Sequence, residues 1–121
     1  MSVNVPFHSE RGADPVVTPG DDPRLPRVLD ALRTVFDPEI PVNILDLGLI
    51  YALEFTPDRV VKVRMTLTSP ACPVAGQLPG QVQAAVAAVP GVESAEVELV
   101  WDPPWSSERI SETARLELGI Y

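Results

Sequence analysis

The chain of 121 residues contains one cysteine and one histidine. A single cysteine cannot form an internal disulfide or a dithiol redox pair, which agrees with a reducing cytoplasm. A cysteine hydrolase needs a histidine as its base, and the single histidine, His8, lies near the N-terminus, far along the chain from Cys72. The sequence therefore argues against both common classes of cysteine enzyme, and we expect a protein that is not an enzyme.

Positive charge and long apolar runs are also scarce. Nine Lys and Arg residues against 17 Asp and Glu residues give a formal net charge of −8. Clustered Lys and Arg are what bind phosphates, so we expect neither nucleic acid nor a membrane as a partner. No apolar run approaches the roughly 20 residues of a membrane span, and no glycine-rich phosphate-binding motif occurs. We expect a cytoplasmic location.

The hydrophobic pattern divides the chain into a tail and one domain. Residues 1–22 contain acidic residues, prolines and glycines without a sustained period, so we expect a flexible tail, followed by a domain over residues 23–121. The first expected element is a helix over 23–36 capped by Asp22, and strands over 49–55 and 59–67 follow it. A second helix should follow Pro73 and end before Pro90, and a third strand should cover 95–101 with Trp101 facing inward. The last helix should begin at about 106 and end at Gly119. Pro79 predicts either a separate first turn around Cys72 or a kink in the second helix.

The order of these elements, α-β-β-α-β-α, predicts an α+β two-layer sandwich with a small mixed three-stranded sheet. The strand–helix–strand crossover should make its two strands parallel, and the turn at Pro57–Asp58 should make an antiparallel hairpin. The C-terminal ends of the parallel strands and the start of the first strand then share one edge of the sheet. This arrangement brings together the loops that contain Asp46, Cys72 and Trp105.

Cys72 is the residue around which we expect the function to be organised. It follows a strand and precedes Pro73 and a helix, and a helix N-terminus favours the thiolate form of cysteine. Thiolates bind soft metals and attack electrophiles. The alternative is that Cys72 is a small buried residue of the core, since free cysteine is often fully buried.

Metal handling is the chemistry that remains open to this edge. Iron–sulfur clusters normally take four thiolate ligands, and this chain supplies one. We therefore expect Cys72 to bind metal transiently, with the other ligands supplied by a second protomer, a client or a small thiol. A homodimer would double the number of thiolates. Thr66 and Thr68 are candidate supporting residues, and we expect Asp46 to bond nearby backbone N–H groups while Gly48 takes a turn.

Four motifs, in order along the chain, resemble a known family. They are Asp37-Pro38-Glu39-Ile40, the stretch from Asp46 to Tyr51, the stretch from Met65 to Pro73, and Trp101-Asp102-Pro103-Pro104-Trp105. They are similar to the signature of the SufT-like and PaaD-like iron–sulfur cluster assembly domains, relatives of the cytosolic iron–sulfur targeting factors. The resemblance implies an accessory factor in cluster assembly or delivery, with a transient iron–sulfur cluster or iron as its cofactor. It also implies the assembly machinery and client apoproteins as partners.

The resemblance carries the family's reactive cysteine onto Cys72 and the acidic residue of its Asp-Leu-Gly motif onto Asp46. A second hypothesis is a protein-binding adaptor, in which Cys72 is structural and the edge loops, with Trp105, dock a partner. A third is a subunit that aids a catalyst such as an oxygenase, which the missing base and cofactor motif disfavour.

Overall fold

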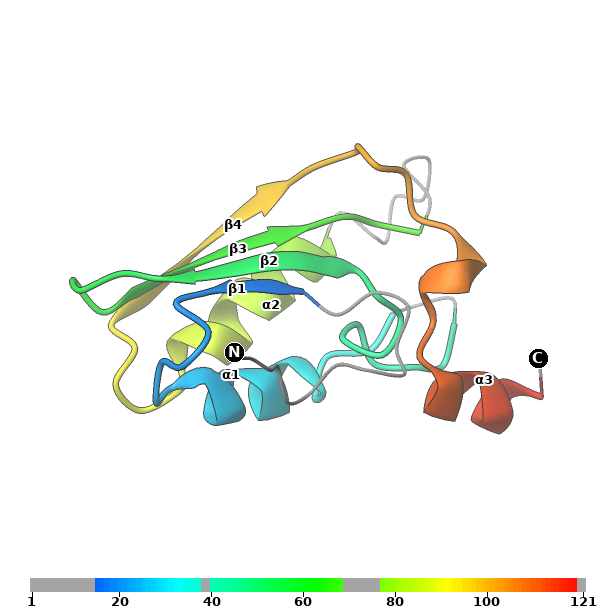
Figure 1. Cartoon of the computed structure of the whole chain (residues 1–121), viewed down its shortest axis with the longest axis horizontal. Coiled ribbons are helices and arrows are strands. Elements are labelled where there is room, and N and C mark those ends of the chain that lie inside the picture. The colour runs from blue at the N-terminus through cyan, green and yellow to red at the C-terminus, as the bar shows by residue number, and fades with distance from the viewer. Residues whose placement is uncertain (1–14, 38–39, 69–76, 120–121) are drawn as a thin grey trace, which may run out of the picture.

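The computed structural model describes residues 15–37, 40–68 and 77–119. In chain order these residues form β1 (Val16–Thr18), α1 (Leu25–Leu32), β2 (Ile50–Phe55), β3 (Val60–Met65), α2 (Leu78–Ala87), β4 (Ser94–Leu99), the short 3₁₀ helix η2 (Ser107–Arg109) and α3 (Glu112–Leu118). The order from α1 to α3 and the α+β class are as predicted (Figure 1). No helix in the described ranges is long and apolar enough to cross a membrane.

The sheet has four strands in the order β1-β2-β3-β4. β2 and β3 form the predicted antiparallel hairpin, and β3 and β4 are parallel neighbours, as the crossover requires. Our expectation of three strands was wrong, because β1 pairs in parallel with β2 along Val16–Thr18. These residues belong to the stretch that we assigned to the tail. A strand of three residues between prolines is too short to produce a detectable alternation.

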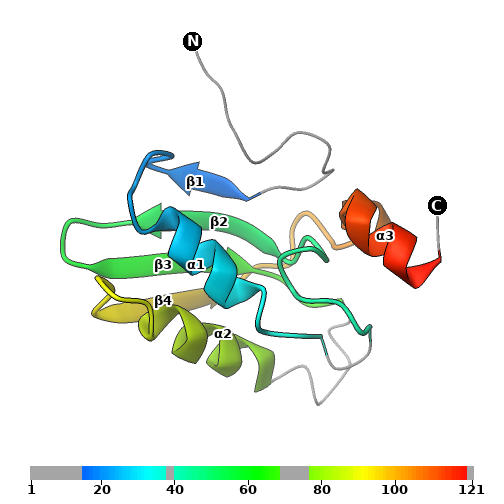
Figure 2. The ribbon, with the colours of Figure 1, turned by 90° about the horizontal axis from the view of Figure 1, so that it is seen from below.

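The helices α1 and α2 cover one face of the sheet, which Figure 2 shows from the helical side. Apolar residues spaced three and four apart give α1 a buried stripe, and β3 buries alternate residues in the same core. The fully buried side chains of this core include Val28, Leu32, Val61, Val63, Met65, Leu78, Val82 and Val86. The opposite face of β3 and β4 carries the exposed charged residues Lys62, Arg64, Glu96 and Glu98.

The first helix begins later and ends earlier than predicted. Asp22 does not cap it, because α1 starts at Leu25 with Arg24 at the N-cap. The Asp22 carboxylate instead accepts hydrogen bonds from the backbone N–H of Arg24 at 2.9 Å and from its guanidinium at 2.8 Å. These bonds lower the pKa of Asp22. The helix ends at Leu32, so Phe36 leaves the predicted stripe and is 55% exposed.

The proline in the second helix is accommodated by the position of the helix start. α2 begins at Leu78, so Pro79 lies in the first turn, where no intrahelical N–H is required. The helix was expected to follow Pro73, and α2 instead begins at Leu78. Cys72 and Pro73 lie outside the described residues, so the position of Cys72 before a helix stays a prediction. The last helix is split, because Ile110 is extended between η2 and α3 and Ser111 caps α3 through its hydroxyl. Gly119 ends α3 as predicted, with a φ of +79°.

Candidate functional site

A cavity of about 390 Å³ lies where β3 and β4 end. It is lined by Thr66, Leu67, Thr68, Trp101, Pro104 and Trp105. The first three follow β3 directly and the others belong to the loop after β4. Parallel pairing of β3 with β4 places both ends at the same edge of the sheet. The antiparallel start of β2 joins them there, since Thr66 donates its N–H to the carbonyl of Leu49 at 2.9 Å. The predicted meeting of strand ends is therefore confirmed for the described residues.

Two side chains fasten the loop after β4, one to the loop before β2 and the other to β2 itself. The indole Nε1–H of Trp105 donates to the carbonyl of Leu47 at 2.7 Å. The hydroxyl of Tyr51 donates to the carbonyl of Pro103 at 2.6 Å. The loop after β4 is thus held by both β2 and the loop before it, and one wall of the cavity is fixed at two points.

Arg109 supports the same wall from η2. Its Nε donates to the carbonyl of Gly48 at 3.0 Å, and its guanidinium carbon lies 4.2 Å from the centroid of the Tyr51 ring, in cation–π contact. Gly48 has a φ of +77°, and a Cβ at this position would lie 2.5 Å from the carbonyl oxygen of Arg109. Only glycine satisfies both the backbone conformation and the close approach.

The surroundings of Tyr51 keep its phenol protonated. Burial raises the pKa of Tyr51, the positive charge of Arg109 opposes this, and the negative charge of Asp102 raises it further. The phenol therefore remains a hydrogen-bond donor to Pro103 throughout the neutral range.

The hydroxyl of Thr66 is the least expected group in the cavity wall. Thr66 is only 1% exposed, and its Oγ1 has no hydrogen-bond partner among the residues that the structure describes. Buried polar side chains nearly always have a partner, because an unmade hydrogen bond leaves the desolvation of the group uncompensated. Thr66 thus lines the cavity while its hydroxyl is left without a partner in the described part of the chain.

Asp46 organises the loop before β2. Its carboxylate accepts a hydrogen bond from the side-chain amide of Asn43 at 2.8 Å, and its backbone N–H donates to the Asn43 side-chain oxygen at 2.9 Å. Its carbonyl accepts from the N–H of Ser111 at 2.7 Å, which links the loop to the start of α3. The observed role of Asp46 is to hold the loop whose next residue, Leu47, receives the Trp105 indole.

The structure brings together Thr66, Thr68 and Trp105 of the predicted site residues, and it places Asp46 in the adjoining loop. Cys72 and Pro73 lie outside the described residues. Trp101 was predicted to face inward, and this was wrong: it is 48% exposed and lines the cavity. It lies beyond Leu99, the last residue of β4, so the alternation of the strand no longer directs its side chain.

Tyr51 and Arg109 were not predicted as site residues from the sequence. Tyr51 ends one of the motifs quoted above, and its place in that motif was a usable signal. Arg109 had none, because its partners Gly48 and Tyr51 are about 60 residues away and one of them is a backbone carbonyl. In the described ranges no group of three or more His, Cys, Asp or Glu side chains could hold a metal ion.

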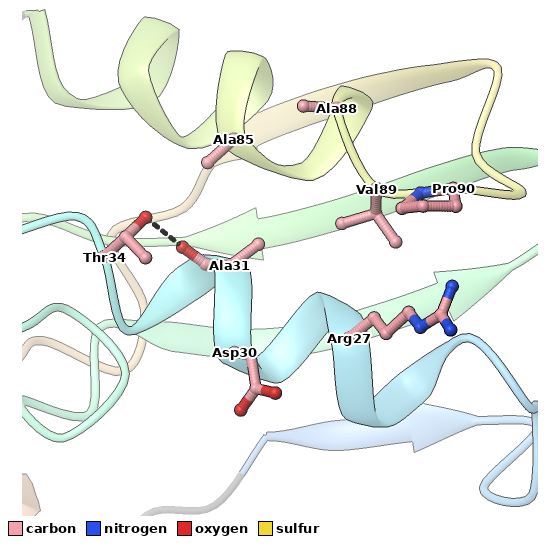
Figure 3. Close-up of a pocket in the computed structure, with 8 residues that line it drawn as sticks. All are labelled: Arg27, Asp30, Ala31, Thr34, Ala85, Ala88, Val89 and Pro90. Atoms are coloured by element: carbon pink, nitrogen blue, oxygen red, sulfur yellow. Dashed lines mark hydrogen bonds between the residues drawn. The ribbon is translucent and has the colours of Figure 1, made fainter.

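A second hollow, of about 540 Å³, lies between α1 and α2 (Figure 3). Ala31, Ala85 and Ala88 line its floor, and the hydroxyl of Thr34 is used locally, since it donates to the carbonyl of Ala31 at 2.6 Å. Its charged lining residues are Arg27 and Asp30, and the carboxylate of Asp30 is already paired with Arg33 at 3.0 Å. The cavity at the end of β3 is the better candidate site.

Comparison with known proteins identifies the family. A family model described as iron-sulfur cluster assembly protein matches residues 26–99, more than half of the chain. The chain belongs to this family. The match ends at the last residue of β4, so it includes β3 and the threonines of the cavity wall.

Members of the iron–sulfur cluster assembly family with similar sequences support this conclusion. An Fe-S protein maturation auxiliary factor of Porphyromonas gingivalis is 47% identical over 93 residues, which cover 77% of this chain and 89% of the relative. The Fe-S protein maturation auxiliary factor SufT of Staphylococcus aureus is 40% identical over 86 residues, covering 71% of this chain and 98% of the relative. These matches confirm the resemblance to SufT-like domains.

A solved structure confirms the fold. The crystal structure of a domain of unknown function, DUF59, from Bacillus anthracis has a TM-score of 0.74 and 39% sequence identity, and the match covers 81% of this chain and 93% of that one.

Proposed function

We propose that this protein is an accessory factor that assembles iron–sulfur clusters or delivers them to client apoproteins through the thiolate of Cys72. The observation that carries the proposal is the buried, unpartnered hydroxyl of Thr66 in a cavity at the edge where β3 ends. The names of the relatives, which are Fe-S protein maturation auxiliary factors, support the same role.

The covalent chain links Cys72 to this cavity. Thr68 lines the cavity, and Cys72 follows it closely in the sequence. An extended chain spans at most about 3.6 Å per residue, which keeps the two Cα atoms within roughly 14 Å. In the proposed role, the Cys72 thiolate supplies one ligand to the cargo, and Thr66 offers its hydroxyl to a ligand that enters the cavity.

A single thiolate suits delivery better than storage. One chain supplies one of the four thiolates that a cluster normally takes, so the remaining ligands would come from a second protomer or from the client. Exchange of these ligands would release the cargo to the client without a catalytic base. A reducing compartment would keep this single thiol available as a ligand, and we therefore place the protein in the cytoplasm.

A specific observation favours the adaptor as the second candidate function. Trp101 is 48% exposed although it lines a cavity, and exposed tryptophans beside cavities are frequent anchors of protein interfaces. In this role the cavity docks a partner, and Cys72 contributes only to packing.

Anaerobic reconstitution with iron and sulfide separates the two candidates. We expect the wild-type protein to acquire a charge-transfer absorbance band and to pass the cluster to an apo-ferredoxin. Cys72→Ser should lose both properties while its melting temperature stays nearly unchanged. The matched control Thr113→Ser, at an exposed position of α3, should retain both. A Cys72→Ser variant that melts much lower, or wild-type protein that acquires no band, would overturn the thiolate proposal and favour the adaptor.

The amount of iron bound per chain tests the shared site. Iron and sulfide are counted in the fractions that sedimentation separates as monomer and dimer. A band confined to the dimer would support a site made by two Cys72 thiolates. A band in the monomer would contradict the homodimer and point to ligands supplied by the client or by a small thiol.

A further inference from the structure

The outer edge of β4 is open in the described part of the molecule. β4 is the last strand of the sheet order and lies at its rim, as Figure 1 shows. Val100 donates its N–H to the carbonyl of Met65 in β3 at 2.8 Å. Backbone groups alternate in direction along a strand, so the N–H and C=O groups of Glu96 and Glu98 also point toward β3. The N–H and C=O groups of Val97 and Leu99 therefore point outward, away from the sheet.

The structure covers only one end of this edge. Ala95 is the third residue with outward backbone groups, and the side-chain amide of Gln83 in α2 donates to its carbonyl at 2.9 Å. Val97 and Leu99 have no such cover among the described residues. Unpaired backbone groups along an edge are the template that an added strand uses.

The charges beside the edge select the kind of strand that can be added. On the exposed face of the sheet, Lys62 lies in register with Glu96, and Arg64 lies in register with Glu98. Arg64 and Glu98 form an ion pair at 3.3 Å. Across the sheet, positive residues on β3 thus lie beside negative residues on β4. A further strand with Lys or Arg opposite Glu96 and Glu98 would continue this alternation of charge from strand to strand. Opposite charges directly across a strand pair stabilise it and like charges destabilise it.

The same charges disfavour a second copy of this chain at the edge. An antiparallel pair of β4 strands centred on Val97 places Glu96 opposite Glu98 of the other copy. Centres on Glu96 or Glu98 place the same glutamate of each copy face to face. The registers that pair most of the strand therefore all bring like charges together.

Beyond the open backbone groups, the edge leads to the cavity. Leu99 is 37% exposed, Trp101 is 48% exposed, and Trp101 lines the cavity that contains the unpartnered Thr66 hydroxyl. A strand that pairs with Val97 and Leu99 would have this cavity at one end. A side chain from its end could enter the cavity.

We propose that β4 is the docking edge for an extended, basic segment of a partner protein. The segment adds a fifth strand to the four-stranded sheet, with Lys or Arg side chains against Glu96 and Glu98 and one terminal side chain in the cavity. The pairing of such a segment with β4 does not depend on the accessory role proposed above. Only the expectation that the partner belongs to iron–sulfur cluster assembly rests on that proposed function.

Two synthetic peptides test the pairing without iron. One alternates Lys with Val over ten residues, and the other has Glu in place of Lys. We expect the Lys peptide, and not the Glu peptide, to bind in calorimetry and to slow hydrogen exchange at the N–H groups of Val97 and Leu99. The N–H groups of Glu96 and Glu98 already face β3 and should change little. Equal binding of both peptides, no binding of the Lys peptide, or protection at another site would overturn the proposal.

Variants of the strand separate backbone pairing from charge. Val97→Pro removes an outward N–H but no bond to β3, and proline is tolerated on the open side of edge strands. Glu96→Gln with Glu98→Gln removes both charges. Each change should weaken binding of the Lys peptide about tenfold. The matched control, Glu112→Gln with Glu117→Gln, changes the net charge equally at exposed positions of α3 and should bind as wild type.

Failure of this proposal and failure of the proposed function give different results. Loss of peptide binding in Glu96→Gln/Glu98→Gln, with normal reconstitution and transfer to an apo-ferredoxin, supports a docking edge separate from the thiolate. Unchanged peptide binding in these variants overturns the docking edge and leaves the tests of Cys72 unaffected. If sedimentation shows a dimer that Val97→Pro dissociates, the occupant is a second copy, and the proposal is wrong.

Discussion

Replacing Thr66 by valine should make this protein more stable and less active. Valine has nearly the shape of threonine and exchanges the hydroxyl for a methyl group. The hydroxyl is 1% exposed and has no partner among the described residues, so its desolvation is uncompensated in the folded state. An unmade hydrogen bond of this kind costs about 1–3 kcal/mol. We expect Thr66→Val to raise the free energy of unfolding by about 1 kcal/mol, which corresponds to a melting temperature roughly 4 °C higher for a domain of this size.

Thr66→Ser provides the opposing control. Serine keeps the hydroxyl and removes a buried methyl group, which should lower the free energy of unfolding by about 1 kcal/mol. The two variants therefore change stability in opposite directions although each alters one small group. Urea unfolding measures both. Both tryptophans of the chain line the cavity, so their fluorescence reports on this region.

The activity of the two variants should follow the hydroxyl and not the stability. We expect Thr66→Val to transfer cluster to an apo-ferredoxin more slowly than wild type, and Thr66→Ser to remain close to wild type. If Thr66→Val were instead destabilised by about 1 kcal/mol or more, the hydroxyl must have a partner in solution. Faster or unchanged transfer in Thr66→Val would show that the cavity does not use this group.

Three further predictions concern the wall of the cavity. Gly48→Ala should lower the free energy of unfolding, measured by urea unfolding, by at least about 2 kcal/mol. The left-handed φ is unfavourable for alanine, and the added Cβ would lie 2.5 Å from the Arg109 carbonyl oxygen. A change in stability near zero would contradict this close approach. Tyr51→Phe should reduce the loss of stability at high pH. Because the pKa of Tyr51 in the folded protein is raised above 10.0, the protonated phenol contributes its full stabilisation of the fold below pH 10, and this stabilisation is lost as the pH rises through the folded pKa. Melting curves of both proteins from pH 8 to 12 measure this, and parallel curves would refute it. Asp46→Ala should cost about 0.5–2 kcal/mol, since it removes the acceptor of the Asn43 amide; an unchanged melt with lost transfer would instead give Asp46 a direct role in function.

Periodicity predicted the central elements of the fold because those elements alternate clearly. Val61, Val63 and Met65 are buried on β3 with Lys62 and Arg64 exposed between them, so the strand and its buried face follow from the pattern. The crossover rule then gave the parallel pairing of β3 with β4, and with it the edge where Thr66, Thr68 and Trp105 meet.

The features that could not be predicted depend on contacts between distant residues or on short segments. β1 has three residues, and its pairing with β2 is set by tertiary structure. Asp22 is a residue type that often caps a helix, but here its carboxylate accepts hydrogen bonds from the guanidinium of Arg24. Arg109 acts through a carbonyl and a ring about 60 residues away, and no local pattern contains that information.

The three hydrogen bonds that fasten the cavity wall depend on the side chain of the donor residue but not on the side chain of the acceptor residue. Trp105, Tyr51 and Arg109 each donate from the side chain, and each acceptor is a main-chain carbonyl, at Leu47, Pro103 and Gly48. A carbonyl is present whichever residue bears it, so the hydrogen bonds themselves require no particular side chain at positions 47 and 103. Any redesign of this protein toward new partners must therefore retain the three donors, and the acceptor positions are restricted for other reasons, since Leu47 is fully buried and Gly48 has a left-handed backbone.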